Sequence, residues 1–381
     1  MSHLALLIPT VDRMGGAESQ LLLLARGLAR RGWRVTVVAL SGSGGQAAVQ
    51  LAADGIGFLS LAMRKGLADP CGWLRFHEWL ARESPDVVHA HLPHAAWLGR
   101  WSRLLARTRV VVDTIHTAST GSLGRQLGYR WSDSLPDAVT AVSHAVADRW
   151  LQARMVDARH LHIVPNGIDL NHWKPQAAMR AEVRKELQLG DAFLWLAAGR
   201  LEGVKDYPTL LRAFALLNEP AFLFVAGSGP CEDSLRQLAL DLRIAERVRF
   251  LGFQPDMRPW MQTADGFVLS SLCEGLPVAV LEAAACGVPT VATAVSGTTE
   301  AVQDGETGFL APVNDPGALA AAMRRLMSAP ADERRAMGVR ARQRVAERYS
   351  LERVLDQWES LYGALLARAA ASVTLLPSGQ T

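Results

Sequence analysis

The sequence contains no apolar run of the roughly 18 residues that a membrane-spanning helix needs, although 49% of its 381 residues are hydrophobic. Its opening stretch, MSHLALLIPTV, lacks the basic segment and cleavage site of a signal peptide and is predicted to form a strand. The four cysteines are scattered, with no C-x-x-C pair and no zinc-type spacing from histidine. These absences predict a cytoplasmic protein without disulfide bonds or structural zinc.

Motifs for several other ligands are also missing. No G-x-G-x-x-G follows the first predicted strand, and no acidic residue ends the second, so the dinucleotide-binding fingerprint is absent. No D-x-D occurs in the chain. The usual acidic site for a metal-bound diphosphate is therefore lacking, and we expect neither a metal nor a cofactor. The arginines are dispersed and no recognition module is present, which argues against nucleic-acid binding.

The net charge of +3 conceals an asymmetry between the two halves of the chain. Residues 1–165 contain 18 Lys and Arg and 12 Asp and Glu, a net charge of +6. Residues 166–381 contain 22 and 25, a net charge of −3. A basic half beside a mildly acidic half is what a chain with two different partners would show.

Apolar runs alternate with helical stretches, which is typical of parallel sheets covered by helices. The pattern is interrupted by Pro, Asn and Gly near VPNGID and then restarts. We predict an α/β protein with two facing Rossmann-like parallel-sheet domains and a central cleft. The predicted domains are residues 1–165 and residues 166–345. Residues 346–381 are predicted to form a C-terminal helix that packs back toward the first domain. The predicted strands are 4–10, 33–40, 86–90, 109–116, 138–143, 162–167, 192–200, 221–229, 247–253, 266–271 and 289–293.

Ligands of open α/β sheets bind outside the carboxyl ends of the strands, so the residues that follow each strand are the candidates. Arg200 and Lys205 follow the first strand of the second domain and could clamp a diphosphate; alternatively, they belong to a solvated loop. Glu274 follows the strand at 266–271, and Glu282 lies on the next helix. The two carboxylates could therefore accept hydrogen bonds from hydroxyls on different parts of one elongated ligand. Alternatively, Glu274 stabilises the helix N-terminus and Glu282 is a buried structural acid.

Gly15 and Gly16 follow the first strand and open a helix, whose backbone N–H groups could bind an anion. A Gly-containing turn is common, so the pair alone is a weak signal.

Taken together, these segments resemble the retaining GT-B glycosyltransferases of family four, or group 1. EGLPVAVLE at 274–282 resembles the E-x7-E signature of that family. GGAESQLLLLARGLARRG, VPNGID, GRLEGVKDYPTLLRAFALL, VAGSGP and DGETGFLAPVNDPGALAAAM resemble its other segments in the same order and at similar spacing. One departure is SGTTE at 296–300, where relatives often have Gly-Gly-x-Pro-Glu, so the conformation of this loop is left open.

The resemblance implies a role for each matched residue. Glu282 would hold the ribose hydroxyls of a nucleotide. Glu274 would hold the transferred sugar together with the backbone of Gly275, Leu276 and Pro277. Arg200 and Lys205 would neutralise the diphosphate, and Gly15 and Gly16 would close on it from the other domain. His116 would lie near the transferred sugar and the β-phosphate, although a lone histidine after a strand is more often structural.

The implied reaction is transfer of a sugar from a nucleotide-diphosphate sugar, expected to be UDP-linked, to an acceptor hydroxyl with retention of configuration. A front-face route fits the lack of an evident nucleophilic carboxylate other than Glu274. HAHLPHAAWLGRW and the segment at 119–150 resemble members that extend lipid-linked sugars in polysaccharide or glycan assembly. The alternatives are a transferase with a soluble acceptor, a nucleotide-sugar epimerase of similar fold, and a non-catalytic nucleotide-sugar-binding subunit.

The helical stretch at 94–109 suggests a membrane contact. It places Trp97 and Trp101 at helical spacing, with Arg100 and Arg103 on another face, and such a helix can lie in an anionic membrane interface. We therefore expect contact with a lipid-linked acceptor and with the inner face of the plasma membrane. The alternative is a packed helix whose tryptophans face the sheet and whose arginines are solvated.

Overall fold

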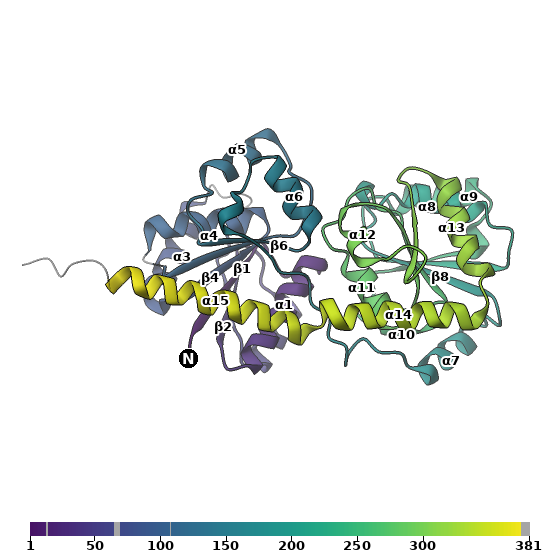
Figure 1. The fold of residues 1–381 in the computed structure, drawn as a ribbon, viewed down its shortest axis with the longest axis horizontal. Coiled ribbons are helices and arrows are strands. Elements are labelled where there is room, and N and C mark those ends of the chain that lie inside the picture. The colour runs from purple at the N-terminus through teal and green to yellow at the C-terminus, as the bar shows by residue number, and fades with distance from the viewer. Residues whose placement is uncertain (13, 65–68, 107, 375–381) are drawn as a thin grey trace, which may run out of the picture. The chain divides into compact units, whose positions relative to one another are not determined.

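The computed structural model describes residues 1–12, 14–64, 69–106 and 108–374. It divides into two units (Figure 1). The first comprises Met1–Gly167 and the chain from Leu351 onward, and the second comprises Ile168–Ser350. The long C-terminal helix therefore belongs to the same unit as the N-terminal half of the chain.

The first unit is built on a seven-stranded sheet in which all neighbouring strands are parallel. The strands lie in the order β3-β2-β1-β4-β5-β6-β7. Their bounds are β1 His3–Ile8, β2 Arg34–Ala39, β3 Gly57–Ser60, β4 Val87–His91, β5 Val110–Ile115, β6 Ala138–Ala141 and β7 Leu161–Ile163. The helices of this unit are α1 Gly16–Arg30, α2 Gly45–Ala53, α3 Pro70–Glu83, α4 Pro93–Leu105, α5 Leu123–Trp131, α6 His144–Gln152 and α15 Leu351–Thr374.

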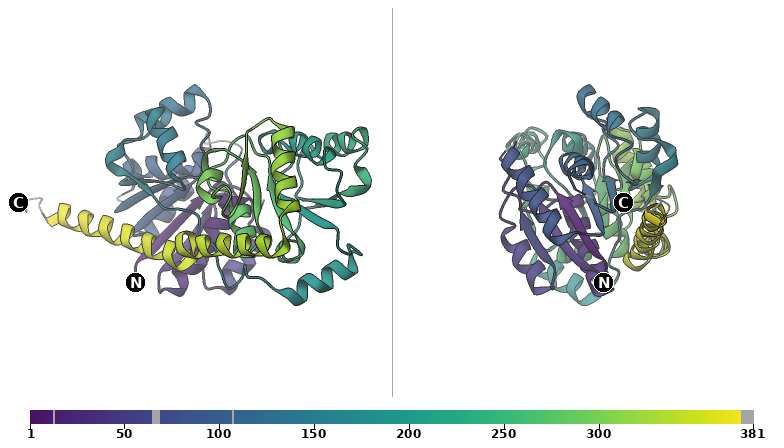
Figure 2. Two further views of the ribbon diagram at one scale, coloured as in Figure 1. Left: turned by 45° about the vertical axis from the view of Figure 1, so that its right-hand side comes forward. Right: turned by 90° about the vertical axis from the view of Figure 1, so that its left-hand side faces the viewer.

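Helices lie on both faces of this sheet (Figure 2), because alternate residues of a strand point to opposite sides. Leu4 of β1 is buried in one cluster with Leu28 of α1 and Leu355 of α15. On the other face, Gly99 of α4 lies close to Leu7. Burial of such a leucine side chain contributes about 1.5–3 kcal/mol, so both layers stabilise the sheet.

The second unit repeats the architecture with a six-stranded parallel sheet in the order β10-β9-β8-β11-β12-β13. Its strands are β8 Phe193–Ala198, β9 Ala221–Ala226, β10 Val248–Gly252, β11 Gly266–Leu269, β12 Thr290–Thr293 and β13 Gly308–Ala311. Its helices are α7 Ala177–Glu186, α8 Tyr207–Ala215, α9 Glu232–Asp241, α10 Arg258–Thr263, α11 Val278–Ala285, α12 Ser296–Ala301, α13 Pro316–Ser328 and α14 Ala331–Tyr349.

The predicted fold class, two Rossmann-like parallel-sheet domains, is confirmed. Each predicted strand exists, but β3 and β13 were missed. Both are four-residue strands at the edge of a sheet, where a strand does not need the continuous apolar run of a buried central strand. Among the described helices, none is both long and apolar enough to cross a bilayer.

Candidate active site

The strand order brings two predicted loops together in the second unit. The first strand of this sheet, β8, lies beside β11, the fourth. Between them the order of the strands reverses, and ligands of such sheets bind at this switch point, outside the carboxyl ends of the strands. Lys205, in a short 3₁₀ turn at Gly203–Lys205, follows β8, and Glu274 follows β11. The fold therefore places a cation and a carboxylate side by side.

Lys205 and Glu274 form an ion pair with 2.6 Å between Nζ and Oε1. The Ser271 hydroxyl donates to the same Oε1 at 2.6 Å. The Ser270 hydroxyl donates to the backbone carbonyl of Lys205 at 2.8 Å, which joins the two loops. The side chains of Lys205 and Glu274 are 22% and 11% exposed, so the pair is shielded from bulk water but still accessible.

Arg200 lies in the same loop and is mostly exposed. Its guanidinium approaches Glu202 at 3.0 Å, and 70% of its side chain is accessible. An ion pair at such an exposed position contributes little free energy. Arg200 could therefore leave Glu202 and pair with an anionic ligand at a small cost in free energy.

The segment after Glu274 is held by close backbone packing. Gly275, Leu276 and Pro277 are all buried, and Pro277 is the N-cap of α11. A Cβ at Gly297 would lie 1.8 Å from the carbonyl oxygen of Gly275. Only glycine is therefore tolerated at position 297, and α12 can lie directly against this loop.

Glu282, on α11, has a different environment from Glu274. The residue as a whole is partly exposed, and within the described part of the chain its carboxylate has no hydrogen-bond or ion-pair partner. Burial raises the pKa of Glu282 to about 8. An acid without a partner in such a position is costly unless it is protonated or binds a ligand.

The SGTTE segment, whose conformation the sequence left open, forms α12 up to its last residue, Ala301. The Thr298 hydroxyl accepts from the Val295 backbone N–H at 3.0 Å and lies 2.6 Å from the carbonyl oxygen of the same residue. Thr298 is fully buried. Its hydroxyl therefore fixes the backbone at the N-terminus of α12, although this chain lacks the proline of the Gly-Gly-x-Pro-Glu pattern.

In the first unit, Gly15 is the N-cap of α1, and Gly16 is its first residue. Among the residues that the structure describes, the N-cap makes no side-chain hydrogen bond to this helix. A Cβ at Gly15 would lie 2.7 Å from Oε2 of Glu18. The absence of a side chain at Gly15 thus leaves room for the Glu18 carboxylate at the positive end of the helix.

His116 follows β5 and is hydrogen-bonded to His91, which is not among the residues predicted from the sequence. Its Nε2 lies 2.9 Å from Nδ1 of His91, the last residue of β4. Burial lowers the pKa of His116 to about 4. His91 ends the strand that neighbours β1 at the switch point of the first sheet, and this position is the signal that would have identified it.

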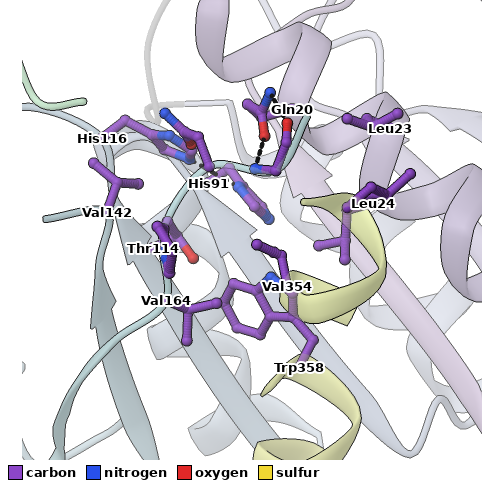
Figure 3. A pocket seen from close by; sticks show the side chains of 14 residues that line it. Gln20, Leu23, Leu24, His91, Thr114, His116, Val142, Val164, Val354 and Trp358 are labelled. Atoms are coloured by element: carbon purple, nitrogen blue, oxygen red, sulfur yellow. Dashed lines mark hydrogen bonds between the residues drawn. The ribbon is translucent and has the colours of Figure 1, made fainter. Parts of the chain in front are cut away.

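A pocket within the first unit lies beside these two histidines (Figure 3). Thr114 and Asn166 contribute polar groups, and Trp358 closes it from α15. Apolar side chains make up much of the remaining lining, namely Leu23, Leu24, Val142, Val164, Leu351 and Val354.

The prediction that Arg100 contacts a membrane is wrong. Its side chain is 0% exposed and pairs with Asp113, which is equally inaccessible. The guanidinium also donates to the Tyr129 carbonyl at 3.2 Å and to the Ser132 hydroxyl at 3.0 Å. Arg100 therefore joins α4 to β5 and α5. Arg103 is partly exposed, and its ion pair with Asp137 makes it a structural residue as well.

The two tryptophans of α4 differ in exposure. Trp97 is partly buried, and a Cβ at Gly128 of α5 would lie 2.3 Å from its ring. Trp101, one turn later, is 44% exposed. Three apolar residues of α5 spaced by four positions are exposed as well: Leu123, Leu127 and Trp131, the last by 81%. Spacing by four places them on one stripe of the helix, away from the buried Tyr129.

Comparisons with known proteins agree with these features. The family model for glycosyl transferases group 1 matches residues 179–344, and the model for glycosyltransferase family 4 matches residues 14–172. N-acetyl-alpha-D-glucosaminyl L-malate synthase of Bacillus anthracis is 30% identical over 74% of this chain and 75% of its own length. The Escherichia coli UDP-Gal:alpha-D-GlcNAc-diphosphoundecaprenol alpha-1,3-galactosyltransferase is 29% identical over 64% of this chain and 66% of its own.

Among solved structures, Anabaena HepE in complex with UDP and glucose superposes with a TM-score of 0.84. It is 21% identical, and the match covers 96% of this chain and 100% of HepE. The likeness shows the fold, and the matched family models and the 30% identical relative show the family. The chain belongs to the group 1, or family four, glycosyltransferases and has their GT-B fold.

Proposed function

We propose that the protein transfers a sugar from a nucleotide-diphosphate sugar, most simply a UDP-sugar, to an acceptor hydroxyl with retention of configuration and without a metal. The observation that carries the proposal is the shielded Lys205–Glu274 pair at the switch point of the second sheet. UDP is the nucleotide named for both HepE and the Escherichia coli relative.

In the second unit each side chain has a distinct role. The Glu282 carboxylate, which has no hydrogen-bond or ion-pair partner among the described residues, would accept hydrogen bonds from the ribose hydroxyls. Lys205 and the exposed Arg200 would neutralise the diphosphate as charge develops on it in the transition state. The first backbone N–H groups of α11, which no side chain of the described residues caps, are suited to the same anion. The backbone of Gly275, Leu276 and Pro277 would line the sugar.

Glu274 is better suited to binding the transferred sugar than to attacking it. Its Oε1 already accepts from Lys205 and Ser271, each at 2.6 Å. These two hydrogen bonds fix the orientation of the carboxylate, so Oε2 can accept a hydrogen bond from a sugar hydroxyl. We therefore favour a front-face reaction, in which the acceptor hydroxyl attacks beside the departing diphosphate. A covalent sugar trapped on Glu274 would overturn this route.

In the first unit we assign a binding role to two groups. The N–H groups at Gly15 and Gly16 would bind anionic oxygens, and His116, neutral near pH 7 because burial lowers its pKa, would hydrogen-bond to an oxygen of the sugar or the phosphate. A neutral imidazole can donate from one nitrogen and accept at the other.

For the acceptor we propose a lipid-linked sugar of polysaccharide or glycan assembly, reached at an anionic membrane surface. The exposed stripe of α5 and the exposed Trp101 of α4 would provide the apolar contacts. Arg130, which adjoins the stripe, is exposed, and neither α4 nor α5 contains an acidic residue. Such a combination of exposed apolar and basic side chains suits an anionic bilayer.

A soluble acceptor is the second candidate, because the malate synthase relative is named for one. The site test uses variants that separate binding from transfer. Glu282→Ala should weaken UDP binding, and Glu274→Gln should slow transfer while leaving UDP affinity within about twofold. If both folded variants retain wild-type affinity and rate, the two carboxylates are structural and the proposal is wrong.

A further inference from the structure

His91 is placed to control the chemical form of His116. It ends β4, its side chain is 3% exposed, and its Nδ1 lies 2.9 Å from Nε2 of His116. Its other nitrogen, Nε2, is buried and has no hydrogen-bond partner among the described residues. The two rings are tilted by 31° with their centroids 5.1 Å apart, so the contact is a hydrogen bond between ring edges and not a stack.

A hydrogen bond between two neutral imidazoles contains one proton. If His91 donates from Nδ1, Nε2 of His116 is the acceptor and the proton of His116 is on Nδ1. If His116 donates from Nε2, its Nδ1 is bare and the proton of His91 moves to Nε2. Both rings are neutral near pH 7, because burial lowers the pKa of each. The tautomers of the two residues are therefore coupled.

The surroundings favour the first arrangement. When His91 donates, the remaining N–H is on His116, whose side chain is partly exposed and can donate to water or to a ligand. When His116 donates, the remaining N–H is on the buried Nε2 of His91, where the described chain offers no acceptor. A buried donor without a partner is expensive, so this second arrangement is disfavoured.

We propose that His91 is a positioning residue that donates from Nδ1 to Nε2 of His116 and so fixes His116 with its proton on Nδ1, as a hydrogen-bond donor toward a substrate oxygen. The direction of the bond follows from the first unit alone, whereas the identity of the substrate rests on the proposed function. Among the described residues, the titratable groups near the pair are His89 on β4, whose ring packs against His91, and Tyr362 on α15, which contacts His89. The α1 side chains that line the pocket, Gln20, Leu23 and Leu24, are uncharged.

His89 provides a matched control on the same strand. It is fully buried, and its Nδ1 and Nε2 bond to the Tyr362 and Thr114 hydroxyls at 2.7 and 2.6 Å. No hydrogen bond joins it to His116 among the contacts of the described residues. Substitution of His89 therefore removes a buried histidine of the same strand without changing the partner of His116.

The test is nitrogen-15 NMR of the imidazole rings at pH 7, which distinguishes a protonated from a bare ring nitrogen without any turnover. We expect the proton of His116 on Nδ1 in the wild type, in His91→Asn, whose amide can still donate, and in His89→Asn. In His91→Leu we expect a shift of that proton toward Nε2. A proton on Nε2 of His116 in the wild type, or no change in a folded His91→Leu, would overturn the proposal.

Kinetics provide the second readout. We expect kcat to fall about tenfold or more in His91→Leu and to recover in His91→Asn, with the KM for the donor nearly unchanged. Equal kcat in His91→Leu and the wild type would count against positioning. If the wild type has no transferase activity with any donor, the proposed function fails while the NMR result still decides the direction of the bond. If His91→Leu does not fold, the wild-type spectrum alone decides it.

Discussion

Lys205 and Glu274 lie 69 positions apart in the sequence and 2.6 Å apart in space. They meet because β8 and β11 are neighbours at the point where the strand order reverses. A cation proposed for the leaving diphosphate and a carboxylate proposed for the sugar therefore form one unit. Each positions the other before a donor binds, which avoids reorganisation during the reaction.

This relationship predicts that the two side chains are not independent in transfer. Lys205→Gln and Glu274→Gln should each lower kcat/KM by about 10²–10³, the usual effect of removing one group that stabilises developing charge. The double variant should lose less than the sum, with a coupling of about 0.5–3 kcal/mol. Initial rates of the four proteins measure it.

The exposed pair of Arg236 and Glu232 on α9, at 2.7 Å, is the control. Arg236→Gln should leave kcat/KM unchanged. Strict additivity of the two site variants would mean that Lys205 and Glu274 act separately.

Glu282 should make the stability of the ligand-free protein depend on pH. Burial raises its pKa from the ordinary value of 4.5, which applies to the unfolded chain, to about 8 in the folded state, so the folded form retains a proton that the unfolded form releases. The resulting stabilisation is complete below pH 4.5 and is lost as the pH rises through 8. In thermal unfolding, the Tm of the wild type should therefore fall relative to that of Glu282→Gln as the pH rises from about 5 to about 8.5. Parallel Tm curves would show that the folded-state pKa of Glu282 is not raised.

The same group should couple UDP binding to proton release. Ribose hydroxyls donate to the ionised carboxylate, so binding at pH 7 should release up to about one proton from wild-type protein and fewer from Glu282→Gln. Calorimetric titrations with UDP in two buffers of different ionisation enthalpy measure this number. Equal proton release in both proteins would exclude Glu282 as the linked group.

Arg100 should act on stability and not on membrane binding. Removing one partner of a buried ion pair typically costs about 3–5 kcal/mol, so Arg100→Met should lower the free energy of unfolding by that amount. Denaturant titration measures the loss, and Arg103→Met, at a partly exposed pair, should cost less. A loss below about 1 kcal/mol for Arg100→Met would contradict the structural role.

The stripe on α5 should carry the binding to anionic vesicles. Trp131→Ser and Leu127→Ser should each weaken binding about tenfold, because they remove apolar surface from the interface. Arg130→Gln should reduce the dependence on salt and on anionic lipid. The control is Val49→Ser at an exposed position of α2, and co-sedimentation measures all four variants beside the wild type. Binding by Trp131→Ser equal to that of the wild type would exclude the stripe.

Much of the fold could be predicted from the sequence, because central parallel strands are continuous apolar runs and leave a strong local signal. The edge strands β3 and β13 have a weaker signal. The charge of Arg100 was visible, but its burial was not, since the partner Asp113 belongs to the next strand and no local pattern shows a long-range ion pair.

Part of the candidate site could be selected from the sequence. Glu274, Arg200 and Lys205 were selected by their positions after strands, and Glu282 by its place on the helix that follows Glu274. The structure adds the Lys205–Glu274 contact, which depends on strand order. His91 was missed because the predicted strand ended one residue early, at position 90, and the residue that follows was not considered as a site residue.

The central claim is most directly tested by nucleotide-diphosphate release. Purified wild type and Lys205→Gln are incubated with a panel of nucleotide sugars, with and without a polyprenyl-diphosphate-sugar or a soluble hydroxyl acceptor. We expect release from one donor, most simply a UDP-sugar, that increases with the polyprenyl acceptor and falls about 10²-fold or more in Lys205→Gln. No turnover of any donor by the folded wild type, or equal turnover by both proteins, would contradict the account.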